Sequence, residues 1–371
     1  MIYLLIVMTF VISIVLSALI IPRILVVAFR KRLFDILDKR KVHTGVVPRL
    51  GGISFVPTIL FSLSFVTALR YLFGYEINLD NHSSVIPEFF LLICGLTLLY
   101  LSGIKDDLVG LKYRTKFMIQ IFCACLFPLS GLWLNNLYGV FGIHELPAWF
   151  GIPFTIMAVV FITNAINLID GIDGLASGLS SVALVIFGFL FLREEMWTYS
   201  MLSFATLGVL IPFFYYNVFG DAGRCKKIFM GDTGSLTLGY LLSFLAIRYS
   251  SYDPDFIPYS EGAIIIAFST LVIPMFDVLR VMLVRWRKHK KVFEPDKNHI
   301  HHKFLAMGFT PRKTMLGILG MSCMFSIMNI LLIRIIDNTI ILILDISLWV
   351  GLNIWFDKLR DNHGKKSFKR Q

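Results

Sequence analysis

The chain has 371 residues, of which 57% are hydrophobic and only 16% are charged, and its formal net charge is +11. A soluble domain of average composition contains about 25% charged residues, so these values exclude an ordinary soluble enzyme. Apolar runs of about 20 residues, the length that crosses a bilayer as a helix, recur along the sequence. We therefore predict an all-α, polytopic membrane protein that contacts membrane lipids and has no nucleic-acid partner.

Eleven apolar runs predict transmembrane helices. The first has no basic region ahead of it and is followed by Arg30, Lys31 and Arg32, which is the pattern of a retained span and not of a cleaved signal peptide. An odd number of spans places the two termini on opposite sides of the membrane. The predicted spans are residues 2–29, 51–73, 87–104, 117–134, 149–166, 175–192, 198–217, 235–250, 262–284, 314–336 and 339–356.

The distribution of basic residues predicts which side of the membrane is cytoplasmic. Of the 35 lysines and arginines, 30 fall in segments on one side of the predicted membrane, namely 30–50, 105–116, 218–234, 280–313 and 357–371. Cytoplasmic segments carry such an excess of basic residues, so we place the N-terminus outside and the C-terminus in the cytoplasm. Residues 1–356 are then one transmembrane domain, and 357–371 form a basic cytoplasmic tail.

The stretch N-A-I-N-L-I-D-G-I-D-G-L, residues 164–175, ends an apolar run with four polar side chains at every third position: Asn164, Asn167, Asp170 and Asp173. Residues three apart are neighbours on a helix surface. Gly171 and Gly174 follow, where a backbone without side chains lets a ligand approach closely. A polar turn between helices would explain one or two of these residues but not four in register. We predict a site here.

A second polar motif, K-D-D-L-V-G-L-K-Y-R-T-K-F-M-I-Q, covers residues 105–120 on the same predicted side. Its adjacent carboxylates, Asp106 and Asp107, repel each other unless a cation or a shared proton relieves them. Lys112, Arg114 and Lys116 follow, and they are suited to binding phosphate. An ordinary solvated loop is an equally good explanation of Lys112 and Arg114.

A third motif, K-K-I-F-M-G-D-T-G-S-L, covers residues 226–236. Asp232 lies between Gly231 and Gly234, at the predicted start of a helix. A carboxylate in this position can hold Mg²⁺ while free backbone N–H groups face phosphate oxygens. The alternative is that Asp232 is a plain helix N-cap.

The fourth motif, E-P-D-K-N-H-I-H-H-K-F, lies in a long basic loop over 285–313. Its histidines could suggest zinc, but they lack a partner at a standard zinc-ligand spacing, so we favour contact with an anion or a sugar phosphate. The residues concerned are Arg285, Arg287, His299, His301 and His302. The first loop, K-V-H-T-G-V-V-P-R-L-G-G, adds Lys41, His43 and Arg49 before Gly51 and Gly52, and its proline and glycines predict a shaped loop.

Carboxylates for a divalent metal, glycine-rich segments and many cations on one side of a membrane are typical of phosphoryl transfer, where positioning and charge neutralisation do most of the catalytic work. The membrane body predicts that one substrate is a lipid. A secondary transporter for a phosphorylated or nucleotide solute is the competing hypothesis, although transporter sites lie near the bilayer midplane and these motifs lie at predicted cytoplasmic ends.

Four motifs resemble, in sequence and order, those of the polyprenyl-phosphate N-acetylhexosamine-1-phosphate transferases of glycosyltransferase family 4. They are K-D-D-x-x-G-L-x-x-x-x-K-x-x-x-Q, N-x-x-N-x-x-D-G-I-D-G-L, M-G-D-T-G-S-L and H-I-H-H, and the similarity covers residues 40–313. The short H-I-H-H loop is most similar to undecaprenyl-phosphate GlcNAc-1-phosphate transferases, which begin O-antigen, enterobacterial common antigen or teichoic-acid synthesis. It is less similar to the phospho-MurNAc-pentapeptide translocase.

The resemblance implies transfer of a sugar phosphate from a UDP-N-acetylhexosamine, by default UDP-GlcNAc, to undecaprenyl phosphate. UMP would be released, at the cytoplasmic face of a bacterial inner membrane, with Mg²⁺ as cofactor and Mn²⁺ as an alternative. The catalytic domain would be residues 1–356, with site loops at 30–50, 105–116, 164–175, 218–234 and 285–313. A homodimer is left open.

Residue roles carry over by motif position. Asp232 would be the principal magnesium ligand, with Asn167 as a second. Asp106 and Asp107 would hold or deprotonate the lipid phosphate, and Lys116 would contact the diphosphate. We expect direct attack on the sugar-bearing phosphorus in preference to an aspartyl-phosphate intermediate. The implied substrate-binding residues are Asn164, Gly171 and Asp173 with Phe229 stacked on uracil, His299, His301, His302, Arg285 and Arg287 at the sugar phosphate, and Lys41, His43 and Arg49 of the first loop.

Overall fold

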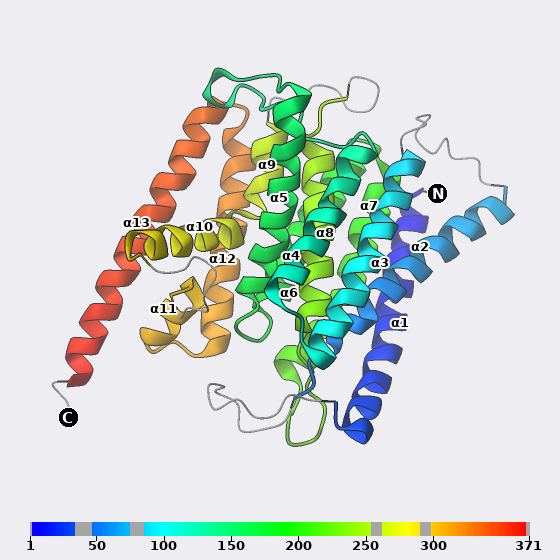
Figure 1. The fold of residues 1–371 in the computed structure, drawn as a ribbon, viewed down its shortest axis with the longest axis horizontal. Coiled ribbons are helices and arrows are strands. Elements are labelled where there is room, and N and C mark those ends of the chain that lie inside the picture. The colour runs from blue at the N-terminus through cyan, green and yellow to red at the C-terminus, as the bar shows by residue number, and fades with distance from the viewer. Residues whose placement is uncertain (1, 34–46, 75–84, 254–261, 290–297, 369–371) are drawn as a thin grey trace.

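The computed structural model describes residues 2–33, 47–74, 85–253, 262–289 and 298–368, and in that part of the chain it is a helical bundle (Figure 1). Short 3₁₀ segments, η1 (Gly51–Ser54) and η2 (Val140–Gly142), and a π-helical turn, η3 (Tyr215–Phe219), supplement the helices. The helices are α1 (Ile2–Lys31), α2 (Phe55–Leu72), α3 (Val85–Val109), α4 (Tyr113–Leu129), α5 (Ala148–Ile169), α6 (Leu175–Arg193), α7 (Trp197–Phe214), α8 (Gly231–Ser250), α9 (Ala263–Ser269), α10 (Val272–Arg287), α11 (Ile300–Ala306), α12 (Pro311–Leu332) and α13 (Asn338–Phe368).

Helix α8 is the centre of the bundle. Every residue from Thr233 to Ser250 is buried, and α8 packs against α3, α5 and α6. Figure 1 shows the other helices arranged around it. Because this helix faces protein and not lipid, it can carry serines and threonines that a lipid-facing span would not tolerate.

Glycines let α8 approach its neighbours closely. A Cβ on Gly103 of α3 would lie 2.4 Å from the Cα of Thr233, and one on Gly239 would lie 2.7 Å from the Cα of Thr163 in α5. Small residues at such contacts are typical of membrane helices, which associate by close packing and not by the hydrophobic effect. This packing fixes where the start of α8 lies relative to the ends of α3 and α5.

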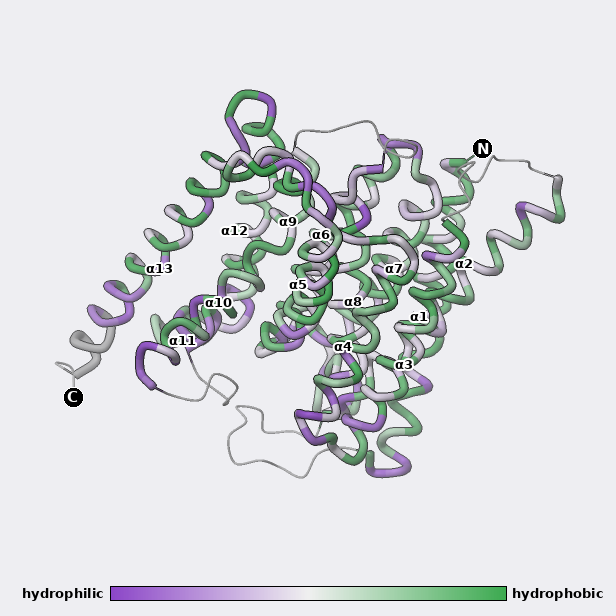
Figure 2. The backbone as a smooth tube through the Cα atoms, turned by 45° about the horizontal axis from the view of Figure 1, so that its top comes forward, coloured by the Kyte–Doolittle hydropathy of each residue, from purple (hydrophilic) through white to green (hydrophobic). Residues whose placement is uncertain are grey.

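The described residues contain eight helical segments that are long and apolar enough to cross a membrane: α1, η1 with α2, α3, α5, α6, α7 with η3, α12 and α13. The remaining three predicted spans correspond to α4, which has 17 residues, to α8, and to the pair α9 and α10. Figure 2 shows apolar residues along the outer helices. The prediction of an all-α polytopic membrane protein is confirmed, whereas the number of eleven spans stays a prediction.

The predicted span over 262–284 is not one straight helix, because α9 and α10 meet at an angle of 76°. That this bent pair forms one span stays a prediction. Helix α10 has buried residues at intervals of three or four, including Pro274, Asp277, Val281 and Arg285. An amphipathic helix of this kind packs one face against the rest of the protein, and its opposite face is exposed. Accordingly, α10 lies across the direction of its neighbours in Figure 1.

The last helix extends beyond its predicted end. The sequence predicts a span over 339–356 and a separate tail from 357, but α13 continues to Phe368. Asp357 is part of the packed body, because one of its oxygens lies 3.0 Å from the ammonium of Lys303 in α11.

Candidate active site

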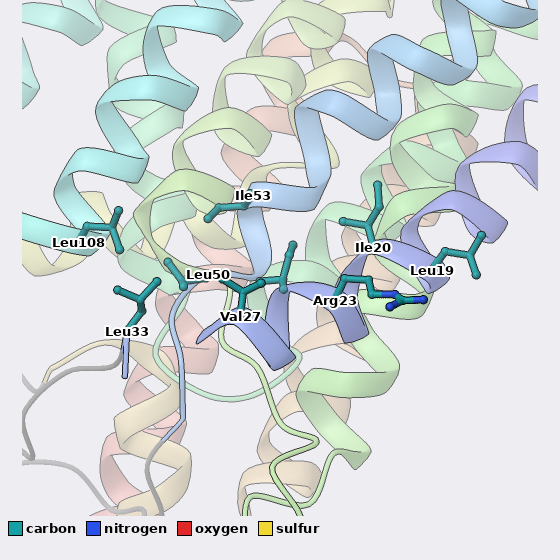
Figure 3. Close-up of a pocket in the computed structure, with 9 residues that line it drawn as sticks. Leu19, Ile20, Arg23, Val27, Leu33, Leu50, Ile53 and Leu108 are labelled. Carbon is teal, nitrogen blue, oxygen red and sulfur yellow. The ribbon is translucent and has the colours of Figure 1, made fainter. Parts of the chain in front are cut away.

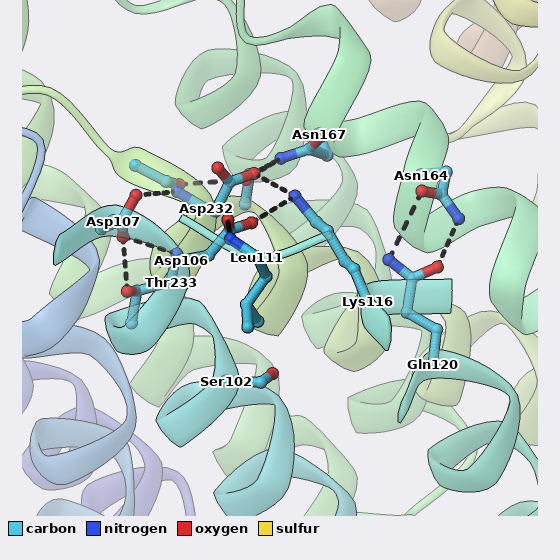
Figure 4. A network of polar contacts seen from close by, with 12 residues as sticks. Ser102, Asp106, Asp107, Leu111, Lys116, Gln120, Asn164, Asn167, Asp232 and Thr233 are labelled. Carbon is cyan, nitrogen blue, oxygen red and sulfur yellow. Dashed lines mark hydrogen bonds and ion pairs between the residues drawn. The ribbon is translucent and has the colours of Figure 1, made fainter. Parts of the chain in front are cut away.

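Four helices bring polar side chains together at one end of the bundle (Figure 4). The end of α3, the start of α4, the end of α5 and the start of α8 meet there. Three of the four predicted motifs are therefore adjacent in space. We call this group the carboxylate cluster, and its members are Asp106, Asp107, Lys116, Asn167 and Asp232.

Asp107 caps α8 from the neighbouring helix. Its Oδ1 accepts a hydrogen bond from the backbone N–H of Asp232 at 2.7 Å, and its Oδ2 accepts from the backbone N–H and the hydroxyl of Thr233 at 2.9 and 2.6 Å. The first N–H groups of a helix have no partner within it, and a carboxylate there also interacts favourably with the helix dipole. Asp232 is thus not the cap but a first-turn residue whose backbone Asp107 holds.

Lys116 bridges two carboxylates. Its ammonium lies 2.5 Å from Oδ1 of Asp232 and 3.0 Å from Oδ2 of Asp106. The other oxygen of Asp106 accepts the backbone N–H of Leu111 at 2.7 Å, which closes the turn between α3 and α4. The side chains of Lys116 and Asp232 keep 20% and 30% of their surface exposed, so a substrate can reach this ion pair.

The two asparagines of α5 have different partners. Asn167 donates from Nδ2 to Oδ1 of Asp232 at 2.6 Å and to the Ser235 hydroxyl at 2.7 Å. Asn164 donates instead to Oε1 of Gln120 in α4 at 2.6 Å and to the Val160 carbonyl at 2.8 Å. Asn167 therefore belongs to the carboxylate cluster, whereas the amide of Asn164 joins α5 to α4. A substrate-binding role for Asn164 stays a prediction.

Glycines bring the first loop onto the start of α8. The backbone N–H groups of Gly51 and Gly52 donate to the carbonyls of Phe229 and Met230, both at 2.9 Å. A Cβ on Gly52 would lie 2.1 Å from the backbone nitrogen of Gly234, so only glycine fits this contact. The predicted shaped loop is confirmed for residues 47–52, and Arg49 lies in it; Lys41 and His43 lie outside the described residues.

A second cluster links the end of the 164–175 stretch to the segment before α8. Oδ2 of Asp173 lies 2.5 Å from the ammonium of Lys227, and that ammonium lies 5.9 Å from the ring centroid of Phe229. The structure thus brings Asp173 near Phe229, as the predicted base site requires. Lys227 belongs to the third motif, but no role is predicted for it from the sequence.

Helix α11 holds the histidine motif, and Asp277 of α10 positions it. Oδ2 of Asp277 lies 2.8 Å from Nδ1 of His299, and Oδ1 accepts the backbone N–H of Ile300 at 2.9 Å and a guanidinium N–H of Arg280 at 2.8 Å. Asp277 is fully buried. Its charge is matched by these donors, so it fixes both the His299 ring and the start of α11.

His301 connects α11 to the 164–175 stretch. A Cβ on Gly171 would lie 2.3 Å from Nε2 of His301, so the glycine makes room for the ring. Burial and the neighbouring His302 and His299 lower the pKa of His301 to about 3, which keeps the imidazole neutral. Its Nδ1 is buried and has no hydrogen-bond partner among the described residues.

The remaining predicted basic residues differ in accessibility. Arg285 is buried on the inner face of α10, and Arg287 is exposed at the end of that helix. Lys112 and Arg114 are exposed at the start of α4, as expected for a solvated segment.

The carboxylate cluster has an excess of negative charge. Asp170, in the turn after α5, is an exposed residue. The protein around its carboxyl and the charges of Asp232 and Asp173 raise the pKa of that group. No group of three or more histidine, cysteine, aspartate or glutamate side chains among the described residues is placed to hold a metal ion. Mg²⁺, however, usually keeps waters and takes one or two carboxylates together with substrate phosphates, so Asp232 and Asn167 fit a magnesium ion that arrives with a diphosphate.

Comparison with known proteins identifies the family of this chain. The sequence model of glycosyl transferase family 4 matches residues 89–250, which include three motifs. A Bacillus subtilis protein named probable undecaprenyl-phosphate N-acetylglucosaminyl 1-phosphate transferase is 32% identical over 330 residues, which cover 88% of this chain and 85% of the relative. The undecaprenyl-phosphate alpha-N-acetylglucosaminyl 1-phosphate transferases of Yersinia pestis and Escherichia coli K12 are 30% and 31% identical over 289 residues, 77% of this chain and 73% of each relative. The chain therefore belongs to glycosyl transferase family 4, as its motifs predicted.

Proposed function

We propose that this protein transfers N-acetylglucosamine 1-phosphate from UDP-N-acetylglucosamine to undecaprenyl phosphate and releases UMP, as the first membrane step of a cell-envelope polysaccharide. The observation that carries the proposal is the carboxylate cluster, in which Lys116 and Asp232 are paired and partly exposed at the end of a membrane bundle. The names of its relatives supply the acceptor and the sugar. Nothing in these relatives favours a transporter.

The proposal includes eleven spans, with the N-terminus outside and the site at the cytoplasmic face of the inner membrane. Each predicted span overlaps a helix or a bent helix pair. The polar motifs at the ends of α3 and α5 and at the start of α8 lie on the same side as the basic segments, which supports this orientation.

We propose that Mg²⁺ is bound by Asp232, with Asn167 as second ligand, when the donor diphosphate enters. The ion would neutralise the diphosphate and favour loss of UMP. In the structure, the ammonium of Lys116 lies between Asp106 and Asp232 and balances part of their charge. Lys116 can turn from these carboxylates toward the diphosphate, since its side chain is flexible and partly exposed.

The reaction is a single displacement. An oxygen of the acceptor phosphate attacks the sugar-bearing phosphorus, the bond from that phosphorus to the oxygen of UMP breaks, and UMP leaves with the electron pair. A phosphate monoester is largely ionised near neutral pH and needs little help from a base. Asp107 is occupied by three hydrogen bonds and Asp106 by Leu111 and Lys116, so neither is placed as a free nucleophile.

The donor would lie between the second cluster and α11. Asp173 and Phe229 would bind the uracil, and the His301 ring, for which Gly171 makes room, would meet the sugar phosphate. The neutral imidazole of His301 can donate to or accept from that group, and a cation there is not required. Arg285, Arg287, His299, His302 and Arg49 supply the surrounding positive charge and hydrogen-bond donors, with Lys41 and His43 completing the first loop.

The test is transfer of label from UDP-N-acetylglucosamine, radiolabelled in the sugar, to undecaprenyl phosphate in membranes that contain the protein. We expect a lipid-soluble product that requires Mg²⁺, is lost on chelation, and is converted back by added UMP. Membranes with Asp232→Asn protein are the control. If no UDP-N-acetylhexosamine gives a labelled lipid, the proposed function is wrong.

A further inference from the structure

The short helix α11, which carries the histidine motif, is too short to be stable by itself. It has seven residues, whereas isolated helices shorter than about 12–15 residues are marginal in water. Contacts with other helices must therefore set its position. Asp277 of α10 holds the start of α11 through His299 and Ile300. His301 and His302 follow, and the next residue, Lys303, makes a second contact.

Lys303 links α11 to the last helix, α13. Its ammonium donates to Oδ1 of Asn353 at 3.0 Å and to Oδ2 of Asp357 at 3.1 Å, and it lies 3.0 Å from Oδ1 of Asp357. Beside this polar contact the ring of Phe304 packs on the ring of Phe356, with centroids 4.8 Å apart. Adjacent residues of α11 thus meet adjacent residues of α13, which fixes both the place and the rotation of the short helix.

The two members of the ion pair differ in exposure. The side chain of Lys303 is 6% exposed and that of Asp357 is 43% exposed. Burial lowers the pKa of the Lys303 ammonium, and the carboxylate of Asp357 opposes this shift. A buried ammonium that loses its carboxylate is costly, whereas an exposed carboxylate that loses its ammonium is solvated by water. Lys303 therefore depends on Asp357 more than Asp357 depends on Lys303.

Helix α13 is longer than a bilayer requires. About 20 residues cross a bilayer as a helix, and α13 has 31. Asn353 and Asp357 are four residues apart and so lie on one face of it. The part of α13 beyond its predicted end at residue 356 begins with the carboxylate that reaches α11, and Figure 1 shows α11 beside this later part of α13.

We infer that Lys303 and Asp357 are positioning residues for the histidine motif: α13 holds α11 so that His301 and His302 meet the sugar phosphate of the donor. The inference rests on the proposed function for the identity of that donor. Neither residue acts on the reacting atoms, but a displacement of about 1 Å caused by a remote substitution can lower a rate about 10²-fold. Loss of the link should weaken recognition of the sugar phosphate and leave recognition of the uridine unchanged.

The donor and the product UMP separate these two effects, because UMP lacks the sugar phosphate. The ratio of the KM for UDP-N-acetylglucosamine to the Ki of UMP therefore reports on the part of the site that α11 forms. We expect Asp357→Ala to raise this ratio about three- to tenfold. Asp357→Glu keeps the charge and should change it by less than about twofold. Asp361→Ala, one turn further along α13 at a side chain that is 63% exposed, is the matched control and should also change it by less than about twofold.

A double-mutant cycle tests whether the two residues act as a pair. Lys303→Met removes the buried charge and keeps most of the apolar volume of the side chain. In Lys303→Met protein, Asp357→Ala should change the ratio by less than about a further twofold, since substitutions within one ion pair are not additive. Additive effects would show that Asp357 acts by another route and would overturn the inference.

A substitution far from α13 controls for general loss of stability. An apolar pocket along α1, lined by Ile20 and Val27 among others, lies on the opposite side of the bundle from α13 (Figure 3). Ile20→Ala should lower the melting temperature and keep the ratio within about twofold of the unaltered value. If Ile20→Ala raises the ratio as much as Asp357→Ala does, the effect is a general one and the inference is wrong.

Hydrogen exchange follows α11 without turnover. In Asp357→Ala protein, the amides of residues 300–306 should exchange about tenfold faster than in the unaltered protein, and those of α8 should not change. Faster exchange of α11 with an unchanged ratio would make the link purely structural and would overturn the inference. If the unaltered protein transfers no sugar phosphate to lipid, the proposed function fails instead, and exchange still shows whether α13 holds α11.

Discussion

The antiparallel pair α3 and α8 carries charged residues at both of its ends, and the two ends differ in how those charges are matched. At one end Glu88 accepts a hydrogen bond from the Tyr199 hydroxyl at 2.6 Å and lies 3.6 Å from Nε of Arg248. All three side chains are buried. At the other end the carboxylate cluster has three aspartates and one ammonium, that of Lys116, which pairs with Asp106 and Asp232, and the Lys116 and Asp232 side chains stay partly exposed.

This difference in charge balance distinguishes a structural ion pair, Glu88 with Arg248, from a ligand-binding site. A buried carboxylate beside a guanidinium and a hydroxyl has its charge balanced within the protein, so it has no need of a ligand. A cluster with unmatched negative charge and accessible oxygens attracts a cation or an ionised substrate. Charged residues in membrane helices are functional candidates in general, but the balance of charge determines which of them bind a ligand.

The largest effect should come from Asp232. We expect Asp232→Asn to lower the rate of sugar-phosphate transfer about 10³-fold, since it removes the charge that pairs with Lys116 and would hold Mg²⁺. Asparagine still accepts hydrogen bonds from Lys116 and Asn167, so the melting temperature should change little. Turnover and thermal unfolding of the purified protein measure the two quantities. Asp221→Asn, at an exposed residue earlier in the same segment, is the control.

A loss of less than tenfold for Asp232→Asn would contradict the assignment of the site to this end of α3 and α8.

Glu88→Gln should lower the stability of the protein and leave its activity nearly unchanged, the reverse of what we expect for Asp232→Asn. It leaves the charge of Arg248 buried without its carboxylate, which costs about 3–5 kcal/mol in comparable buried pairs. Thermal unfolding in detergent should show a clearly lower melting temperature. Transfer per folded molecule should stay within about twofold of the unaltered rate, because the pair lies at the far end of α3 from the carboxylate cluster. Loss of turnover at an unchanged melting temperature would mean that both ends are functional.

Substitution of Asp107 should lower both stability and activity, because Asp107 belongs to the carboxylate cluster and also holds the start of α8. Asp107→Asn cannot accept all three hydrogen bonds from the start of α8, so we expect about 1–3 kcal/mol of destabilisation together with a loss of activity of about 10- to 100-fold. Thr233→Val removes only the hydroxyl bond and should cost about 1 kcal/mol. Unfolding and transfer assays on both variants test this. If Asp107→Asn loses activity without loss of stability, Asp107 acts on the lipid phosphate directly.

Within the site, Asn167 and Asp173 should affect different steps. Asn167→Ala should lower kcat and raise the Mg²⁺ concentration needed for half-maximal rate, each about tenfold, because Asn167 contacts Asp232. Asp173→Ala should raise the KM for the UDP-sugar about tenfold with a smaller change in kcat, because Asp173 lies with Lys227 and Phe229. Steady-state kinetics with varied donor and Mg²⁺ separates them. If both variants change the Mg²⁺ requirement and the donor KM equally, Asn167 and Asp173 do not act on different steps.

The motifs predicted the carboxylate cluster because its residues lie in short segments at the ends of apolar runs. Asp277, Glu88 and Arg248 were missed because each stands alone inside or beside such a run. Their partners lie in other segments of the chain: Glu88 meets Arg248, and Asp277 of α10 meets His299, which precedes α11. An isolated charge in an apolar run is the signal that could have indicated them, since it must find a partner or a function in the membrane.

Asn164 should give the smallest effect, and it tests whether every polar residue near the site belongs to it. Its amide and that of Gln120 exchange hydrogen bonds between α5 and α4, at 2.6 and 3.4 Å. If this is the whole role of Asn164, Asn164→Leu or Gln120→Leu alone should cost about 1 kcal/mol by leaving one buried amide without its partner. The double variant should regain most of that stability, since replacing both partners by apolar groups is close to neutral.

The KM for the donor should stay within about twofold of the unaltered value in all three variants. A rise in that KM with Asn164→Leu but not with Gln120→Leu would place Asn164 in the substrate site, where its motif position predicted it, and would extend the functional end of the bundle by one turn of α5.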